Sequence, residues 1–132
     1  MHNRELVNPP ELHPAPGFSH VAIASGTKVV HVAGQVALGP DFGLVGGDDL
    51  YEQTRAAMEN VKVALDAAGA TWDDAAPPAI YTLRPTEYET ITRAIDAVTG
   101  GAEHPAQTIV GITGLAVPGL LIEIECTAVL PT

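Results

Sequence analysis

The polar residues best placed to do chemistry lie in two segments near the end of the chain. The segment AEHPAQTIVGI presents Gln107 at the start of a β-branched run, and the segment LLIEIECTAVL presents Glu123 and Glu125. A glutamate can act as a general acid or base. Gln107 offers two N–H donors and one acceptor in a plane, but no charge. Gln107 therefore either heads a binding site for an uncharged group or simply begins a strand.

The spacing of the two glutamates places both on one side of a strand. Glu123 and Glu125 are two residues apart, so they share a face, while the opposite face carries Ile122, Ile124 and Cys126 and is expected to lie in the core. An ordinary solvated strand face would look the same, and we assign Glu125 to that alternative. Because Cys126 is the only cysteine, the sequence predicts no internal disulfide and no thiolate metal cluster.

Composition narrows the classes of partner. The chain of 132 residues has a net charge of -10 and a pI near 4.6, and its six Lys and Arg residues are scattered singly. Such a surface repels phosphate backbones and anionic lipids, so we expect no nucleic acid and no membrane as partners. The five histidines lack chelating spacing, so we expect no metal site and no cofactor. No apolar leader or run of about 18 apolar residues occurs, which favours a cytoplasmic protein.

Hydrophobic periodicity predicts seven elements in one domain, residues 1–132. Four prolines make residues 1–16 an extended lead-in. Alternating segments at 18–25 and 29–37, joined by Gly26 and Thr27, predict a hairpin. Apolar residues at helical spacing predict a helix from Asp48 to Gly69 and a second one that opens with a capping box of Thr86 and Glu89. The remaining predicted strands are residues 79–83, 108–112 and 120–130.

This order of elements predicts an α+β two-layer sandwich. Two helices can cover one face of a mixed sheet, which leaves the other face without a helix. The chain is 46% hydrophobic with a mean hydropathy of +0.18, which is apolar for a small domain. We therefore expect three or more copies to pack their open sheet faces together.

Four further motifs stand in order along the chain: Ala33-Gly34-Gln35, Asn60-Val61-Lys62, Pro105-Ala106 and Ile122-Glu123-Ile124-Glu125. With these motifs the chain resembles, from about residue 17 to residue 130, the RidA (YjgF) family, the reactive intermediate deaminases that are also called L-PSP-type endoribonucleases. The resemblance implies a chorismate-mutase-like fold and a homotrimer with a small-molecule cleft at each subunit interface. It also implies hydrolysis of enamines or imines, in which an arginine binds the substrate carboxylate and a glutamate positions water.

The resemblance carries over unevenly at the residues that would line this cleft. Glu123, the implied catalytic residue, is kept, and so is Gly34. Gln107 stands where the family has its carboxylate-binding arginine, and Phe18 replaces a tyrosine. Ala33 replaces a serine.

Two further positions complete the implied substrate-binding set. Ile109 replaces a frequent cysteine, and Thr92 occupies a helix position where asparagine is common. Most of the replacements remove polarity or charge, so a neutral or amide-bearing ligand becomes the expected one. His104 borders the Pro-Ala-Gln segment and is expected to be a turn residue.

Two functions remain open from the sequence. One is an imine or enamine hydrolase of altered specificity, with Glu123 handling protons and Gln107 orienting the substrate. The other is a non-catalytic trimer that binds a small ligand and has lost deaminase activity. An endoribonuclease is disfavoured by the negative charge and the lack of clustered Lys or Arg.

Overall fold

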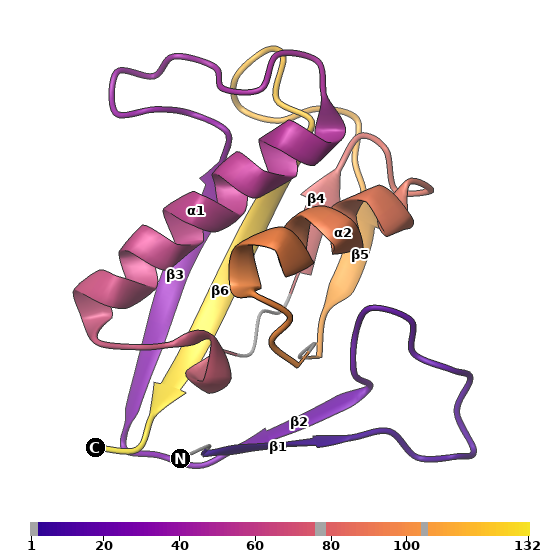
Figure 1. Cartoon of the computed structure of the whole chain (residues 1–132), viewed down its shortest axis with the longest axis vertical. Helices are drawn as coiled ribbons and strands as arrows, with labels where there is room; N and C mark the ends of the chain where they lie inside the picture. The colour runs from indigo at the N-terminus through magenta and orange to yellow at the C-terminus, as the bar shows by residue number, and fades with distance from the viewer. Residues whose placement is uncertain (1–2, 76–78, 104–105) are drawn as a thin grey trace.

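Two helices cover one face of a four-stranded mixed sheet in the computed structural model, which describes residues 3–75, 79–103 and 106–132 (Figure 1). The strands in sheet order are β3 (Lys28–Val36), β6 (Ile122–Leu130), β4 (Ala79–Thr82) and β5 (Thr108–Gly111), and the helices are α1 (Leu50–Ala68) and α2 (Tyr88–Thr99). Strand β6 runs antiparallel to both of its neighbours, β3 and β4, whereas β4 and β5 are parallel. The predicted α+β sandwich is confirmed.

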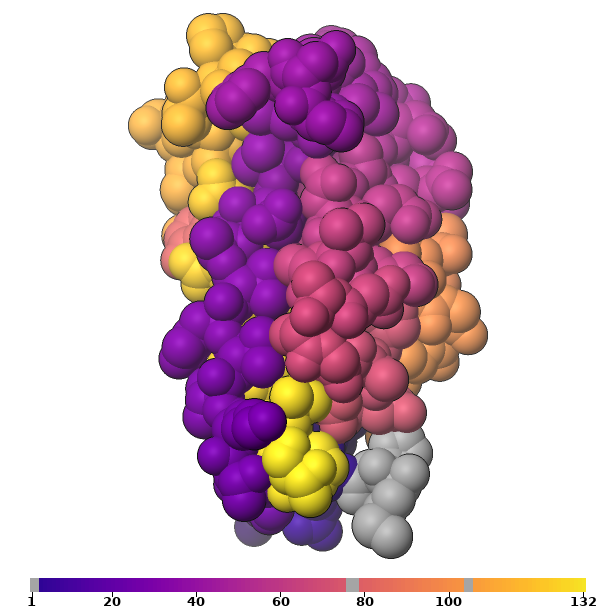
Figure 2. Space-filling model, turned by 90° about the vertical axis from the view of Figure 1, so that its left-hand side faces the viewer, coloured from indigo at the N-terminus to yellow at the C-terminus, as the bar shows by residue number. Residues whose placement is uncertain are grey.

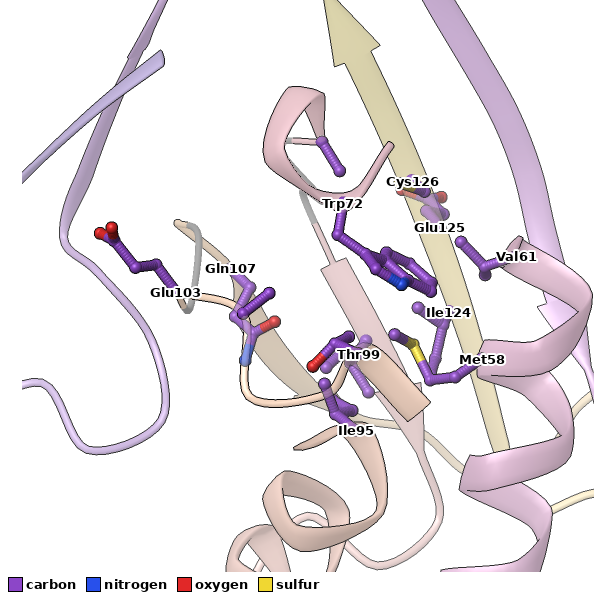
Figure 3. Close-up of a pocket in the computed structure, with 13 residues that line it drawn as sticks. Met58, Val61, Trp72, Ile95, Thr99, Glu103, Gln107, Ile124, Glu125 and Cys126 are labelled. Atoms are coloured by element: carbon purple, nitrogen blue, oxygen red, sulfur yellow. The ribbon is translucent and has the colours of Figure 1, made fainter. Parts of the chain in front are cut away.

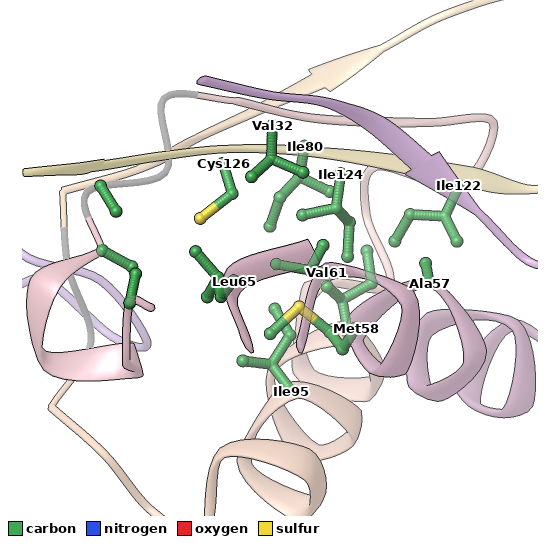
Figure 4. Close-up of a cluster of buried hydrophobic side chains, with 14 of the residues drawn as sticks. Val32, Ala57, Met58, Val61, Leu65, Ile80, Ile95, Ile122, Ile124 and Cys126 are labelled. Atoms are coloured by element: carbon green, nitrogen blue, oxygen red, sulfur yellow. The ribbon is translucent and has the colours of Figure 1, made fainter. Parts of the chain in front are cut away.

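The core lies between the helices and the inner face of β6. Alternate residues of β6 are buried, which confirms that Ile122, Ile124 and Cys126 face inward (Figure 4). They pack against apolar residues of α1 such as Val61 and Leu65. Burial raises the pKa of the Cys126 thiol to about 11. A 3₁₀ turn, Trp72–Asp74, follows α1, and Trp72 packs against this core.

Three of the four helix ends carry a residue that is well suited to that position. Asp49 caps α1 by accepting a hydrogen bond from the backbone N–H of Glu52 at 3.0 Å, and Gly69 closes that helix at a φ of 76°. Gly100 closes α2 in the same way. The capping box predicted at the start of α2 is wrong, because α2 begins at Tyr88 after a turn that contains Thr86, and no side chain caps it.

The predicted hairpin of residues 18–25 and 29–37 is also wrong. Residues 21–24 form β2 (Val21–Ala24), which pairs with β1 (Arg4–Val7) from the lead-in, in a two-stranded sheet that lies across one end of the molecule (Figure 1). We call residues 3–25 the arm. The strand that follows, β3, belongs to the main sheet instead.

The turn between β2 and β3 explains this difference. The N–H of Thr27 donates to the Leu130 carbonyl at 2.9 Å, and the N–H of Ser25 donates to the Asn3 carbonyl at 2.8 Å. A Cβ built on Gly26 would collide with the same Leu130 carbonyl. The turn is therefore held against the end of β6, and the chain runs on into β3 without folding back on β2.

Candidate functional site

A hollow of about 510 Å³ opens where the arm meets the start of α2 and the start of β5. Its volume falls within the range of about 300–1,000 Å³ that is usual for small-molecule sites. Residues from three separate parts of the chain line it. They are His13, Pro14, Pro16, Gly17, Phe18, His20, Tyr88, Thr92, Gln107, Thr108 and Ile109.

Three rings from the arm form one wall of this hollow. The Phe18 ring meets His20 edge-on at 5.2 Å between centroids, and His13 meets His20 edge-on at 4.7 Å. The position of His20 is fixed, because its Nε2 donates to the His13 carbonyl at 2.8 Å and its backbone N–H donates to Asn8 Oδ1 at 2.8 Å. These contacts hold a largely apolar, aromatic wall against which a planar ligand could stack.

Gln107 joins the arm to the sheet at the edge of the hollow. Its Nε2 donates to the Gly17 carbonyl at 2.9 Å, and a β-bridge between Ser19 and Ala106 lies beside it. Among the described residues, no group donates a hydrogen bond to the Gln107 Oε1. Within that part of the chain, the side chain therefore keeps one acceptor and one N–H with no partner.

Thr92 of α2 and Gly17 of the arm approach each other closely. Gly17 has a φ of 76°, and a Cβ added there would lie 2.7 Å from Thr92 Oγ1. Because only glycine tolerates both the conformation and the contact, this position fixes how near the arm comes to α2. The distance sets the width of the hollow at that point.

The hollow carries no fixed charge among the described residues that line it. No Asp, Glu, Lys or Arg is present in the lining. Arg93 lines an adjoining hollow of about 360 Å³, where its guanidinium lies 5.4 Å from the centre of the Tyr51 ring. A charged ligand would thus lose its hydration in the hollow without gaining an opposite charge.

A second, smaller cavity lies behind Gln107, between the helices and the sheet (Figure 3). Its volume is about 40 Å³, and its lining is mostly apolar, with Met58, Ile95 and Ile124 among the contributors. This space is too small for a metabolite. It is a packing defect of the core beside the candidate site.

The open face of the sheet carries the other half of the predicted site. Glu123 and Glu125 share this face, as predicted. A register shift in β3 between Val32 and Gln35 leaves Ala33 and Gly34 in a bulge. The Glu123 side chain lies directly over Gly34, because a Cβ built on Gly34 would collide with the Glu123 carboxylate.

Glu125 has a partner that the sequence analysis missed. The Tyr81 hydroxyl donates to Glu125 Oε1 at 3.1 Å, whereas Glu125 was expected to be merely solvated. This hydrogen bond is the main reason why the pKa of Tyr81 is raised, and the charges of Glu125 and Glu123 add to it. Tyr81 lies opposite Glu123 in the register of β4 and β6. The alternation of residues along β4 could have shown, from the sequence, that Tyr81 shares a face of the sheet with the two glutamates.

The predicted site residues therefore fall into two groups within one chain. Phe18, Thr92, Gln107 and Ile109 line the hollow, whereas Ala33, Gly34 and Glu123 are not among its lining residues and lie together at the bulge of β3. His13 and His20 were not predicted to contribute. His104 lies outside the described residues.

No group of three or more His, Cys, Asp or Glu side chains is arranged to hold a metal ion in the part of the chain that the structure describes. Within the same residues, neither helix has the length and apolar character that a bilayer span needs.

Residues 9–130 match the protein family described as Endoribonuclease L-PSP. The RutC family protein YjgH of Escherichia coli is 32% identical over 111 residues, which are 83% of this chain and 81% of that protein. Among solved structures, YyfB of the Rid protein family from Yersinia pestis is 39% identical, with 97% and 99% of the two chains covered and a TM-score of 0.89. A YjgF family member from Mycobacterium tuberculosis is 30% identical over 96% and 99% of the chains, with a TM-score of 0.64.

Proposed function

The chain belongs to the endoribonuclease L-PSP family, which includes the RidA and YjgF proteins, and on this premise we propose that it binds a small uncharged molecule in the hollow beside Gln107. The observation that carries the proposal is the chemistry of the lining. An amide with free hydrogen-bonding capacity stands next to an aromatic wall, and no fixed charge lies among the described lining residues.

The energetics favour a neutral ligand over a carboxylate. By the family resemblance, Gln107 stands at the position of the arginine that binds the substrate carboxylate. A hydrogen bond to a charged group contributes about 1.5–3 kcal/mol, whereas a neutral one contributes about 0.5–1.5 kcal/mol. Exchanging the arginine for an amide therefore weakens carboxylate binding by roughly tenfold to a few hundredfold. An amide-bearing ligand keeps both of the hydrogen bonds that Gln107 can offer.

A matched pair of ligands tests this preference. Benzamide and benzoate have nearly the same shape, and only benzoate carries a charge. We expect titration calorimetry to show at least about tenfold tighter binding of benzamide by the wild-type protein, and Gln107→Arg to reverse the preference. Thr113→Arg is the control, because it adds the same charge on an exposed loop residue outside the hollow. Tighter binding of benzoate by the wild-type protein would contradict the proposal.

A second candidate function is the hydrolysis of an imine or enamine of altered specificity. One observation favours it: Glu123 lies over the bulge at Gly34 and so has a defined position on the sheet. A carboxylate held in this way could direct a water molecule at an imine carbon. In that function Glu123 would move protons while Gln107 orients the substrate.

The assembly that fits either function is a homotrimer. The open sheet face has no helix over it in the described part of the chain, and it carries exposed apolar residues such as Val29 and Val110. Three copies that pack these faces together would remove that surface from water. Light scattering at micromolar concentration tests the proposal, and a monomer there would contradict it. Ribonuclease activity is disfavoured, because a net charge of -10 repels RNA.

A further inference from the structure

The outer edge of β3 is available for another strand. On one side β3 pairs with β6 along its length, and no described strand pairs with its other side. In the space-filling view, β3 (purple) forms a column on the surface beside α1 (Figure 2). Val29 on this strand is 61% exposed. A long apolar strand with unpaired N–H and C=O groups readily accepts a strand from another chain.

The arm offers such a strand. Among the described strands, β2 pairs only with β1, on one side, and its apolar side chains Val21 and Ile23 are 38% and 51% exposed. A two-stranded sheet is marginally stable by itself in water. Further pairing of β2 would therefore stabilise the arm and cover apolar surface at the same time.

The sequences of β2 and β3 match each other as partners, although the structure places them in different sheets. Their alternation is that of a hairpin, and the turn between them is held against Leu130 instead of closing. When a hinge keeps two complementary strands apart, the same contacts can form between two copies. We propose that β2 of one copy pairs antiparallel with β3 of a neighbouring copy.

The short turn sets the register of this pairing. Residues 25–27 form the turn, so Ala24 lies opposite Lys28, Ile23 opposite Val29, and Val21 opposite His31. Because Val29 pairs with Val129 on β6, Ile23 would extend an apolar row across the open face. The pairing thus buries exposed apolar side chains from both copies.

The same register joins the two halves of the candidate site. Continued toward the N-terminus, it brings Phe18 to the bulge at Ala33 and Gly34 of the neighbouring copy, and the Glu123 side chain lies over Gly34 in each chain. Phe18 and Gln107 line the hollow of the first copy. The neighbouring copy therefore supplies the carboxylate that the hollow lacks within one chain. This last step rests on the proposed ligand site, whereas the strand pairing does not.

The similarity to the Yersinia pestis structure supports the observed position of the arm. The arm makes up 23 of the 132 residues, about a sixth of the chain. A superposition that misplaced it would lose about that share of its score, but the score of that comparison falls short of one by only 0.11. At least part of the arm therefore occupies the same place in that protein.

Disulfide trapping between two tagged chains tests the exchange. In a Cys126→Ala background, one chain carries Val21→Cys and a differently tagged, coexpressed chain carries His31→Cys. Single-cysteine chains cannot link internally, so a covalent heterodimer reports pairing between copies. We expect its yield to exceed that of the control, Val21→Cys with Val63→Cys on the exposed surface of α1, by at least about tenfold, because a disulfide needs Cα atoms within about 7 Å.

Two outcomes would overturn the exchange. The first is a heterodimer yield equal to that of the control, both for this pair and for the next pair in the register, Ile23→Cys with Val29→Cys. The second is a link that forms only within one chain when both cysteines are placed on it. Benzamide binding is measured separately. Failure of the strand exchange can therefore be distinguished from failure of the proposed ligand site.

Discussion

The hollow beside Gln107 and the bulge beneath Glu123 differ in nearly every property that matters for chemistry. The hollow has aromatic rings along one wall and an amide at its edge, and it carries no fixed charge among its described lining residues. Beside the bulge, the open face of the sheet carries the carboxylates of Glu123 and Glu125, and the Tyr81 hydroxyl donates a hydrogen bond to Glu125. The proposed functions assign recognition of an uncharged molecule to the first region and proton transfer to the second.

The separation teaches that a single chain holds two incomplete sites. Recognition residues come from the arm, α2 and the start of β5, whereas the carboxylates come from β6. On the strand exchange proposed above, a reaction that needs both groups would use a second copy. Binding alone requires only the hollow. Experiments that disturb one region and leave the other intact can separate these possibilities.

The largest effect is expected for the family's own reaction. In a coupled dehydratase assay, we expect the wild-type protein to hydrolyse 2-iminopropionate at least about a hundredfold more slowly than a family member that has the arginine. Gln107→Arg alone should not restore the reaction, because Phe18 and Ala33 also lack the hydroxyl donors of the family pattern. Turnover comparable to that of a RidA deaminase, or rescue by the single change, would contradict this expectation.

A large effect on stability is expected at Gly17. Gly17→Ala forces a side chain into a left-handed conformation and against Thr92, so we expect a loss of about 2–4 kcal/mol in urea unfolding. Gly47→Ala is the matched control: its φ is +54°, but no atom lies within 4 Å of an added Cβ, so the expected loss is about 1–2 kcal/mol. Thr92→Ala should recover part of the Gly17→Ala loss. Equal losses at both glycines would show that the arm does not press on α2.

A smaller effect is expected at the bulge. Gly34→Ala displaces the Glu123 carboxylate, but this half-buried side chain can turn away, so the expected loss of stability is about 1 kcal/mol. If the collision is the cause, Gly34→Ala should have little effect in a Glu123→Ala background. A double-mutant cycle measures the coupling. Additive losses would show that Glu123 does not lie over Gly34.

The smallest effect concerns Tyr81. Its pKa is raised from 10.0 mainly by the hydrogen bond to Glu125. Because the folded-state pKa lies above the unfolded one, this contribution to stability is fully present below pH 10 and is lost as the pH rises through the raised pKa. Ultraviolet titration, with Tyr81→Phe identifying the signal, should show the pKa falling in Glu125→Gln. An unchanged pKa in that variant would assign the shift to another cause.

Much of the fold follows from periodicity in the sequence. The alternation in β6 correctly predicted which residues are buried, and Asp49 and Gly69 correctly marked the ends of α1. These features are local, because each depends on a residue and its near neighbours. The capping box at Thr86 failed because a turn closed by Glu87 and Arg84 delays the start of α2.

The position of the arm could not be predicted in this way. Two alternating segments and a short turn look like a hairpin, and only the contacts of that turn with Leu130 and Asn3 show otherwise. Those partners are more than 20 residues away along the chain, so no local pattern encodes them. The site depends on the arm, and for this reason His13 and His20 were missed.

The buried Cys126 gives the protein an internal chemical reporter. With a pKa of about 11, only about one thiol in ten thousand is ionised at neutral pH, and the thiolate is the form that reacts with alkylating reagents. Modification of the native chain must then wait for a rare opening that admits both solvent and reagent. The rate of alkylation at the Cys126 sulfur would therefore report how often the sheet opens around this residue, and the protein needs no added label for this measurement.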